Sequence, residues 1–337
     1  MGNDNQSAIK IIIAVGLLAA VFLFLLAISL RSSMEPREEE RVQLGMNYSA
    51  FDYDRAMEDI AYMESLGPRP SVSEALNELR SYLLSELADV GLEVRQYPFV
   101  LEADSAVTAS DGEGVNLVAV VEGDAPGVVL VGAHYDSKVR SDIEFVGTNQ
   151  SASGAAWLLE MARLWGPERS GRSLWLVWFD GHEAVDEAIT MPALQGSQAL
   201  VAQLEAEQRL SAIDAMIYVG QIGDCYLNIS RDEGAPAWLW EQFEETATRL
   251  GYRKHFSQRR QGFLGDFKAF REAGTPALAL VDFVYGGSIL NHSNYWHTEE
   301  DRIDKLCGAS LRAVADVMVH ALPGLERRLD EALEGED

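Results

Sequence analysis

Three segments of the sequence carry side chains that could take part in acid–base or metal chemistry. In the first, His134 stands two residues before Asp136. In the second, His182 and Glu183 are adjacent, and in the third, His297 lies near the C-terminal end of the chain. An imidazole close to a carboxylate is a common device at metal sites, because the carboxylate orients a ring while another group holds the ion.

Together, His134, Glu183 and His297 would supply two imidazoles and one carboxylate. That set suits zinc, which in catalytic sites takes three protein ligands and keeps a fourth position for water. Asp136 would then lie behind the ligands and orient a ring. The alternative is that these residues face solvent in surface loops. Their joint occurrence after three expected strands favours a shared site.

Each of the three segments follows an apolar stretch typical of a buried strand. Such stretches occur at residues 94–100, 115–121, 128–133, 174–179, 215–220 and 277–281. Helical patterns occupy residues 54–65, 152–165, 193–208, 235–250 and 309–328, and a capping box of Ser71 and Glu74 predicts another helix to about residue 90. This alternation predicts an α/β fold in three layers, with a mostly parallel central sheet and helices on both faces. Ligands bind beyond the carboxyl ends of such strands.

Several longer motifs contain these residues. They are Gly67-Pro68-Arg69, His134-Tyr135-Asp136-Ser137-Lys138, Gly147-Thr148-Asn149-Gln150-Ser151-Ala152-Ser153-Gly154, Phe179-Asp180-Gly181-His182-Glu183-Ala184 and Trp296-His297-Thr298. In this order they resemble the M28 family of zinc aminopeptidases and the related glutaminyl cyclases, over nearly all of residues 55–325. The second and last motifs look more like the cyclase branch. The resemblance implies a zinc-aminopeptidase-like fold, of the phosphorylase/hydrolase type.

The resemblance also implies metal ligands, and several are replaced in this chain. Family aminopeptidases hold two zinc ions that share a bridging aspartate, and the residue at that position here is Gln150. One zinc also takes the histidine matched by His134 and an aspartate at a later strand end, where this chain has Gly220. The other zinc is held by the bridging residue and by the counterparts of Glu183 and His297. We therefore expect one zinc ion at most, on Glu183 and His297, with help from His134, from His182 or weakly from Gln150.

Proton transfer and substrate binding are also implied by the resemblance. The family's general acid/base is a glutamate just before the ligand glutamate, and that residue here is His182. Histidine moves protons near neutral pH, so the replacement changes the base without removing one. Asp266 matches a carboxylate that the cyclase branch uses, which makes it a second candidate base and a substrate contact. Trp296 matches the aromatic wall beside the last metal ligand.

An uncharged apolar stretch at residues 11–30 lies between Lys10 and Arg31. About twenty such residues form a helix long enough to cross the hydrocarbon core, which predicts a single-pass membrane anchor. A signal peptide fits less well, because its apolar core is about 7–15 residues long and ends at small residues. We expect a short segment at 1–10 before the anchor, a charged tether at 31–50, the M28-like domain at 51–330 and an acidic tail at 331–337.

Charge and cysteine content limit the partners and the compartment. The chain has 53 acidic and 27 basic residues, a formal net charge of −26, which argues against nucleic acid as a partner because acidic surfaces repel phosphates. The two cysteines, Cys225 and Cys307, allow either one disulfide or two buried thiols. Charges beside the anchor do not fix its orientation, and the family resemblance favours an extracytoplasmic domain.

Two functions remain open from the sequence. The first is a membrane-anchored, zinc-dependent enzyme that acts on peptide or protein N-termini, as an aminopeptidase or as a glutaminyl-peptide cyclotransferase. The second is a catalytically inactive family member that serves as a tethered binding or structural domain. The replacements at positions 150, 182 and 220 are what the second function predicts, since a fold can outlast its chemistry.

Overall fold

The computed structural model describes residues 49–102, 112–184, 191–286 and 295–334. The predicted anchor at 11–30 and nearly all of the predicted tether at 31–50 lie outside these described residues. Within the described ranges, no helix combines the length and the apolar character needed to cross a membrane. Residues from Ser49 onward form one compact unit.

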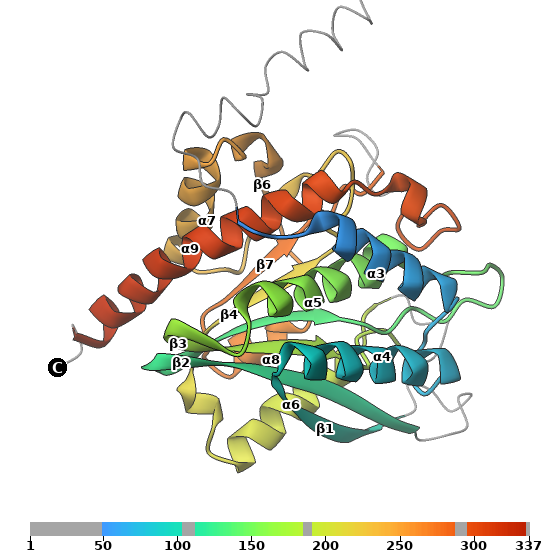
Figure 1. The fold of residues 1–337 in the computed structure, drawn as a ribbon, viewed down its shortest axis with the longest axis horizontal. Helices are drawn as coiled ribbons and strands as arrows, with labels where there is room; N and C mark the ends of the chain where they lie inside the picture. The colour runs from blue at the N-terminus through green and yellow to red at the C-terminus, as the bar shows by residue number, and fades with distance from the viewer. Residues whose placement is uncertain (1–48, 103–111, 185–190, 287–294, 335–337) are drawn as a thin grey trace, which may run out of the picture. The chain divides into compact units, whose positions relative to one another are not determined.

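A mixed sheet forms the centre of the fold (Figure 1). Its strands are β1 (Glu93–Leu101), β2 (Gly112–His134), β3 (Glu168–Phe179), β4 (Ile213–Gly220) and β7 (Ala277–Val281). The pairs β2–β4 and β4–β7 are parallel, whereas β1 runs antiparallel to β2. The connection from β1 to β2 spans only residues 102–111, too few for the crossover that a parallel pair requires. The expected α/β sheet is therefore confirmed, with a mixed rather than mostly parallel strand arrangement.

The long strand β2 contributes to the sheet twice. Residues 128–134 pair in parallel with β3, and His134 lies opposite Phe179. The earlier part of β2 pairs with β3 in the reverse sense, from Leu117 opposite Trp178 to Val121 opposite Leu174. Consequently β3 lies between the two halves of β2, which are the two separate strands expected at 115–121 and 128–133. The residues that follow His134 and Phe179 emerge at the same edge of the sheet.

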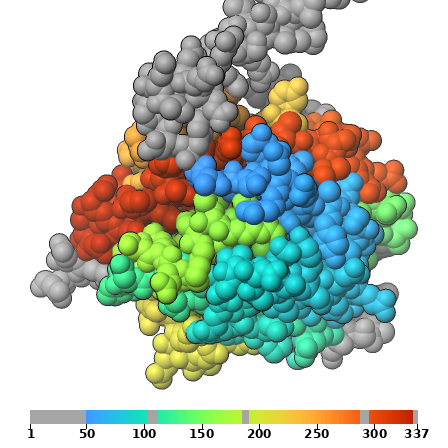
Figure 2. Space-filling view, in the orientation of Figure 1, coloured from blue at the N-terminus to red at the C-terminus, as the bar shows by residue number. Residues whose placement is uncertain are grey.

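Helices cover both faces of the sheet. They are α3 (Tyr53–Ser65), α4 (Glu74–Val90), α5 (Ser153–Trp165), α6 (Gln195–Ala206), α7 (Ala237–Arg249), α8 (Phe267–Glu272) and α9 (Gly308–Glu334). In Figure 1, α3, α4, α5 and α9 lie on one side of the sheet, and α6 and α8 lie on the other. Figure 2 shows α3, α4 and α9 together at the surface of the first side. On the second side, Leu130, Val177 and Met216 of the strands pack with Leu200 and Leu204 of α6.

Several smaller elements differ from expectation. The strands β5 (Ile229–Asp232) and β6 (Phe256–Gln261) form a separate two-stranded sheet, and short helical turns occupy Leu210–Ala212, Arg253–His255 and Ile303–Lys305. Ser73, and not Ser71, caps α4, because its side chain accepts the Leu76 N–H. Ser71 instead donates its hydroxyl to Asp180. Helix α9 continues to Glu334, into the segment expected to be an acidic tail.

A disulfide joins Cys225, in the loop after β4, to Cys307, just before α9. The backbone N–H of Cys307 also bonds to the carbonyl of Gly223, 2.9 Å away. The N–H of Gly223 in turn bonds to the side-chain oxygen of Asn149 at 2.7 Å. The disulfide therefore ties the loop after β4 to the start of α9, and the bond between Gly223 and Asn149 ties the same loop to the turn that contains Gln150.

We expect removal of this disulfide to destabilise the domain. It closes a long loop, because its cysteines are 82 positions apart in sequence, and such a bridge restricts the unfolded chain. The expected cost of replacing both cysteines with serine is about 2–4 kcal/mol. Calorimetry should show a lower melting temperature for this variant, and the wild type in reducing buffer should move toward it. Equal melting temperatures for the variant and the oxidised wild type would contradict a stabilising role.

Candidate functional site

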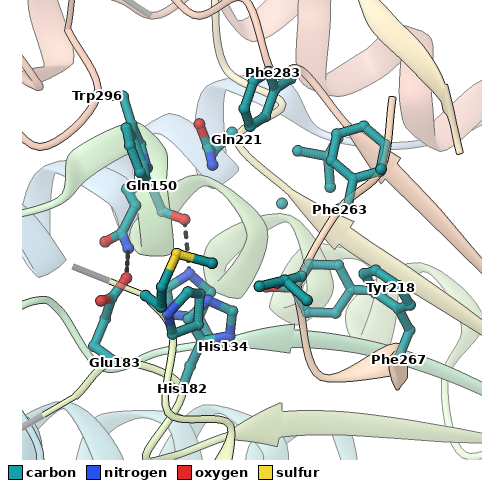
Figure 3. Close-up of a pocket in the computed structure, with 16 residues that line it drawn as sticks. His134, Gln150, His182, Glu183, Tyr218, Gln221, Phe263, Phe267, Phe283 and Trp296 are labelled. Atoms are coloured by element: carbon teal, nitrogen blue, oxygen red, sulfur yellow. Dashed lines mark hydrogen bonds between the residues drawn. The ribbon is translucent and has the colours of Figure 1, made fainter. Parts of the chain in front are cut away.

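Most of the residues predicted to do chemistry meet at one edge of the sheet. His134 is the last residue of β2, His182 and Glu183 follow β3, and Gly220 ends β4. All four line one pocket of about 230 Å³ (Figure 3). The pocket is also lined by Gln150, Met191, Pro192, Tyr218, Gln221, Gly262, Phe263, Leu264, Phe267, Val281, Phe283 and Trp296.

Both ring nitrogens of His134 are engaged. Nδ1 lies 3.1 Å from the carbonyl oxygen of Asp136 and 3.3 Å from its carboxylate Oδ1. Nε2 lies 2.9 Å from the carbonyl oxygen of Gln150. A carbonyl oxygen only accepts, so each of these contacts needs a proton on the ring nitrogen that makes it, and Nε2 cannot bind a metal while it donates to Gln150. Asp136, expected to orient a ring, also accepts the backbone N–H of Glu183 at 2.9 Å.

The Glu183 carboxylate is surrounded by donors. The amide nitrogen of Gln150 donates to Oε1, and His297 Nε2 lies 3.5 Å from the same oxygen. The Lys138 ammonium lies 3.6 Å from Oε2, and both of these side chains are buried. Burial alone would raise the pKa of Glu183, but the nearby His297 and His182 outweigh it and lower the pKa to about 2. Glu183 is therefore ionised at neutral pH.

His182 is held by the carboxylate of Asp266, which the sequence analysis expected to contact substrate. Its Nδ1 lies 2.7 Å from Oδ2 of Asp266, which is fully buried. The ring stacks on His134, with centroids 3.9 Å apart, and on Tyr218, with centroids 6.3 Å apart. Burial lowers the pKa of His182, but the charge of Asp266 and its hydrogen bond raise it to about 9. At neutral pH the ring is therefore protonated and can donate a proton.

His297 and Trp296 form a second stacked pair, in which Trp296 lines the pocket and His297 lies behind its lining residues. Their ring centroids are 3.9 Å apart, and the Phe145 ring packs edge-to-face with the His297 ring, with 5.5 Å between those two centroids. The carbonyl of His297 accepts a hydrogen bond from Arg140 at 2.8 Å. Trp296 lines the pocket, as an aromatic wall would.

The opposite side of the pocket is apolar. Phe263, Phe267 and Phe283 stand there with Tyr218, across from Glu183 and the two histidines, as Figure 3 shows. Apolar walls with a few convergent polar groups are typical of small-molecule and peptide-end sites. Sequence reasoning missed this wall, because its phenylalanines come from loops and from the start of α8, where they fit a core position equally well.

Gln150 belongs to a short π-helical turn, Thr148–Ala152, that sequence reasoning did not foresee. The buried carboxylate of Asp301 accepts the N–H of Asn149 at 2.6 Å and that of Gln150 at 3.2 Å. Burial raises the pKa of Asp301 to about 6 despite these bonds. The buried guanidinium of Arg69 donates to the carbonyl of Val146 at 2.9 Å, just before the turn. These contacts fix the backbone that carries Gln150.

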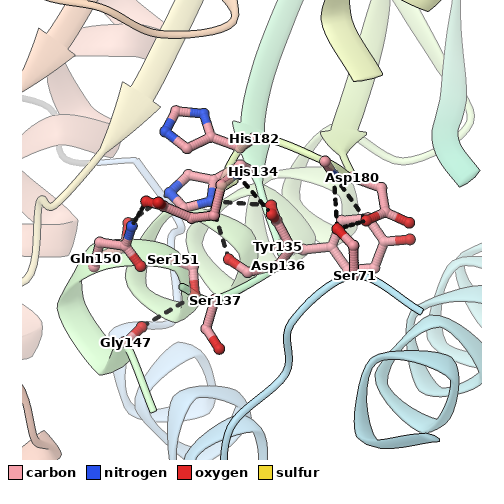
Figure 4. Close-up of polar contacts among 12 residues, drawn as sticks. Ser71, His134, Tyr135, Asp136, Ser137, Gly147, Gln150, Ser151, Asp180 and His182 are labelled. Carbon is pink, nitrogen blue, oxygen red and sulfur yellow. Dashed lines mark hydrogen bonds and ion pairs between the residues drawn. The ribbon is translucent and has the colours of Figure 1, made fainter. Parts of the chain in front are cut away.

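Asp180, in the same motif as His182, does not line the pocket. Its two oxygens accept hydrogen bonds from Ser71 at 2.7 Å and from the N–H of Val115 at 2.9 Å, and Arg80 lies 3.2 Å away (Figure 4). Burial and the charge of Asp136 raise the pKa of Asp180 to about 6. Asp180 therefore joins the start of α4 to the central strands and has a structural role.

The donor set can be compared with what zinc requires. Within the described part of the chain, no cluster of three or more His, Cys, Asp or Glu residues is arranged to hold a metal. Glu183 Oε2 and His297 Nε2 have no hydrogen-bond partner among the described residues, although the Lys138 ammonium lies 3.6 Å from Oε2. At the third position, however, Gln150 presents its amide nitrogen to Glu183, and an amide nitrogen has no lone pair to offer. His134 Nε2 is also engaged, so these residues do not fit the expected three-ligand zinc site.

Comparison with known proteins places this geometry in a family. The model of peptidase family M28 matches residues 116–322. The glutaminyl-peptide cyclotransferase of Drosophila melanogaster is 28% identical over 150 residues, which cover 43% of this chain and 42% of that protein. Aminopeptidase YwaD of Bacillus subtilis (strain 168) is 26% identical over 203 residues, 58% of this chain and 41% of that protein. The chain thus spans less than half the length of these two relatives.

A solved structure agrees over a larger part of the chain. The crystal structure of a glutaminyl cyclase from an Acidobacteriales bacterium superposes with a TM-score of 0.76 at 26% identity. The superposition covers 84% of this chain and 97% of the cyclase. The family model alone covers more than half of the sequence, and the fold and the motif order agree with it. The chain therefore belongs to peptidase family M28.

Proposed function

We propose that this protein is a membrane-anchored member of the M28 family that binds peptide N-termini in its pocket without zinc-dependent turnover. The observation that carries the proposal is the state of Glu183. Its carboxylate accepts the Gln150 amide and faces Lys138 and His297, so protein groups stand where a metal would be needed. A pocket that keeps its lining residues but has lost its metal-coordinating residues can still bind a peptide end.

The pocket suits a peptide end with an apolar first residue. Glu183 lines the polar end, and its Oε2, which has no hydrogen-bond partner among the described residues, can accept a hydrogen bond from the ammonium of a free N-terminus. Phe263, Phe283 and Leu264 line the remainder and would contact an apolar side chain. Glutamine, whose amide would need polar partners along this wall, fits it less well.

The proposed location rests on two features. The apolar stretch at residues 11–30 has the length of a single-pass anchor. The disulfide between Cys225 and Cys307 is typical of an oxidising compartment, which supports an extracytoplasmic position for the domain. Protease added to intact cells should therefore cleave the domain.

Binding and turnover can be measured on the full-length chain in detergent micelles. We expect labelled peptides with a free N-terminal phenylalanine or leucine to bind at least about tenfold more tightly than the same peptides after N-acetylation. Mass spectrometry should detect neither a released amino acid nor a cyclised product. Phe283→Ala should weaken binding, whereas Val100→Ala, at an exposed position on β1, should not. Equal affinity for free and acetylated peptides would overturn the proposal.

One observation favours a second function, a zinc-dependent enzyme of the same family. His182 lines the pocket next to Glu183, with the Asp266 carboxylate behind it, which is how a proton-transferring histidine is commonly held. In that case the same assay would give a product, and a chelator would abolish its formation. His182→Ala would then lower the rate while zinc was retained.

A further inference from the structure

We propose that the Gln150 amide keeps this site closed to metal, so that a single Gln150→Asp substitution would open a zinc site on Glu183 and His297. The inference rests on the proposed zinc-free state of the pocket and goes further. It assigns that state to the Gln150 side chain, whereas Glu183 and His297 keep the spacing that two donors on one metal need.

Two of the three required donors are already in position. His297 Nε2 lies 3.5 Å from Glu183 Oε1. Two donors on one tetrahedral zinc, each roughly 2.1 Å from the ion, would be about 3.4 Å apart. Both side chains are held by contacts that need no metal, since Asp136 accepts the Glu183 N–H and Trp296 stacks on the His297 ring. Glu183 Oε2 and His297 Nε2 also have no hydrogen-bond partner in the described part of the chain.

The third donor position is closed by the orientation of the Gln150 amide. Its nitrogen donates to Glu183 Oε1, the oxygen that also lies near His297. The side-chain oxygen of Gln150 faces Gly147. A Cβ atom built on Gly147 would lie 2.8 Å from this oxygen. An N–H facing a carboxylate neutralises part of its charge, as a cation would, but it occupies the space between the donors. The amide thus replaces a metal contact with a hydrogen bond.

The backbone at Gln150 does not need to move for this change. Its N–H bonds to Asp301 and its carbonyl bonds to His134, so the residue is fixed on both sides of its Cα atom. A substitution here changes the side-chain chemistry on a fixed support. An aspartate would place a third anionic or neutral donor beside Glu183 and His297, which completes a three-ligand set that zinc accepts.

The same change has a cost when no metal is present. The aspartate would lose the amide hydrogen bond and would face the carboxylate of Glu183, and like charges at close range repel. The metal-free Gln150→Asp variant should therefore melt at a lower temperature than the wild type. Zinc should raise its melting temperature again, because an ion that binds only the native state stabilises it.

The test compares full-length wild type, Gln150→Asp and Gln150→Asn, each exposed to zinc, desalted and analysed for metal by mass spectrometry. Asparagine is the matched control, because it has the shape of aspartate but lacks the charge. We expect about one zinc per chain in Gln150→Asp, with a zinc-dependent rise in melting temperature, and less than about a tenth of an equivalent in the other two. The combination Gln150→Asp with His297→Ala should lose the metal again.

Several results would overturn the inference. A Gln150→Asp variant that is folded by circular dichroism but takes up no zinc would show that other residues close the site. Equal zinc uptake by Gln150→Asn, or retention of zinc after His297→Ala, would show that the metal binds elsewhere. The proposed function fails on a different result, which is the absence of N-terminus-dependent peptide binding in the wild type.

Discussion

Replacing Glu183 with alanine should lower the melting temperature of the domain by roughly 10 °C, corresponding to about 3–5 kcal/mol. The substitution removes a buried carboxylate that faces the Lys138 ammonium at 3.6 Å and accepts the Gln150 amide. Removing one member of a buried ion pair is costly, because the opposite charge stays in a poorly solvated place. Thermal unfolding of the full chain measures the effect.

A double-mutant cycle with Lys138→Met gives the control. If Glu183 and Lys138 stabilise each other, the double variant should be more stable than the sum of the two single losses predicts. At a vacant metal site that had no internal partners, loss of Glu183 would change stability little. A melting temperature within about 2 °C of the wild type would therefore contradict the role given to Glu183 here.

The second large effect is expected at Arg163, on the side of the molecule covered by α3, α4 and α5. This guanidinium contacts Asp59 at 2.5 Å, Glu86 at 2.7 Å and Glu160 at 3.2 Å. Arg163→Met would leave the nearly buried Asp59 and Glu160 carboxylates close together without this shared cation. We expect a loss of about 3–5 kcal/mol, again roughly 10 °C in melting temperature.

Arg55 and Tyr82 limit this loss, since Arg55 still pairs with Glu160 at 2.7 Å and Tyr82 still donates to Asp59 at 2.5 Å. The matched control is Arg95→Met, which breaks an exposed pair with Glu93. Exposed pairs contribute about 0–1 kcal/mol, so this variant should melt close to the wild type. Similar losses of stability for Arg95→Met and Arg163→Met would show that the Arg163 ion pairs with Asp59, Glu86 and Glu160 stabilise the domain no more than an exposed pair does.

The strands of the central sheet could be predicted where the sequence has several consecutive apolar residues. Strands such as 128–133 and 174–179 are buried on both faces, and this burial produces the continuous apolar stretches that identify them. Strand β6 could not be found in this way, because its residues after Phe256 are mostly exposed and polar. The strand expected at 94–100 is β1, but its antiparallel direction was not predicted, since apolar runs say nothing about strand direction.

The site was predicted by residue type but not by contact. The motifs placed His134, His182 and Glu183 at one sheet edge, because parallel strands bring their carboxyl ends together. The motifs could not predict that the backbone carbonyl of Gln150 contacts His134, because every residue has a backbone carbonyl and the sequence does not show which one lies near the ring. Asp301 was missed for a related reason: it ends a run with Glu299 and Glu300 that has the composition of a solvated surface.

The metal content of the wild-type protein tests the central claim most directly. The full-length chain would be purified without chelators, exposed to excess zinc, desalted and assayed for metal and for peptide turnover in the same sample. The closed arrangement of Gln150 and Glu183 predicts less than about a tenth of an equivalent of zinc and no turnover. One tightly held zinc per chain, together with chelator-sensitive release or cyclisation of an N-terminal residue, would contradict it.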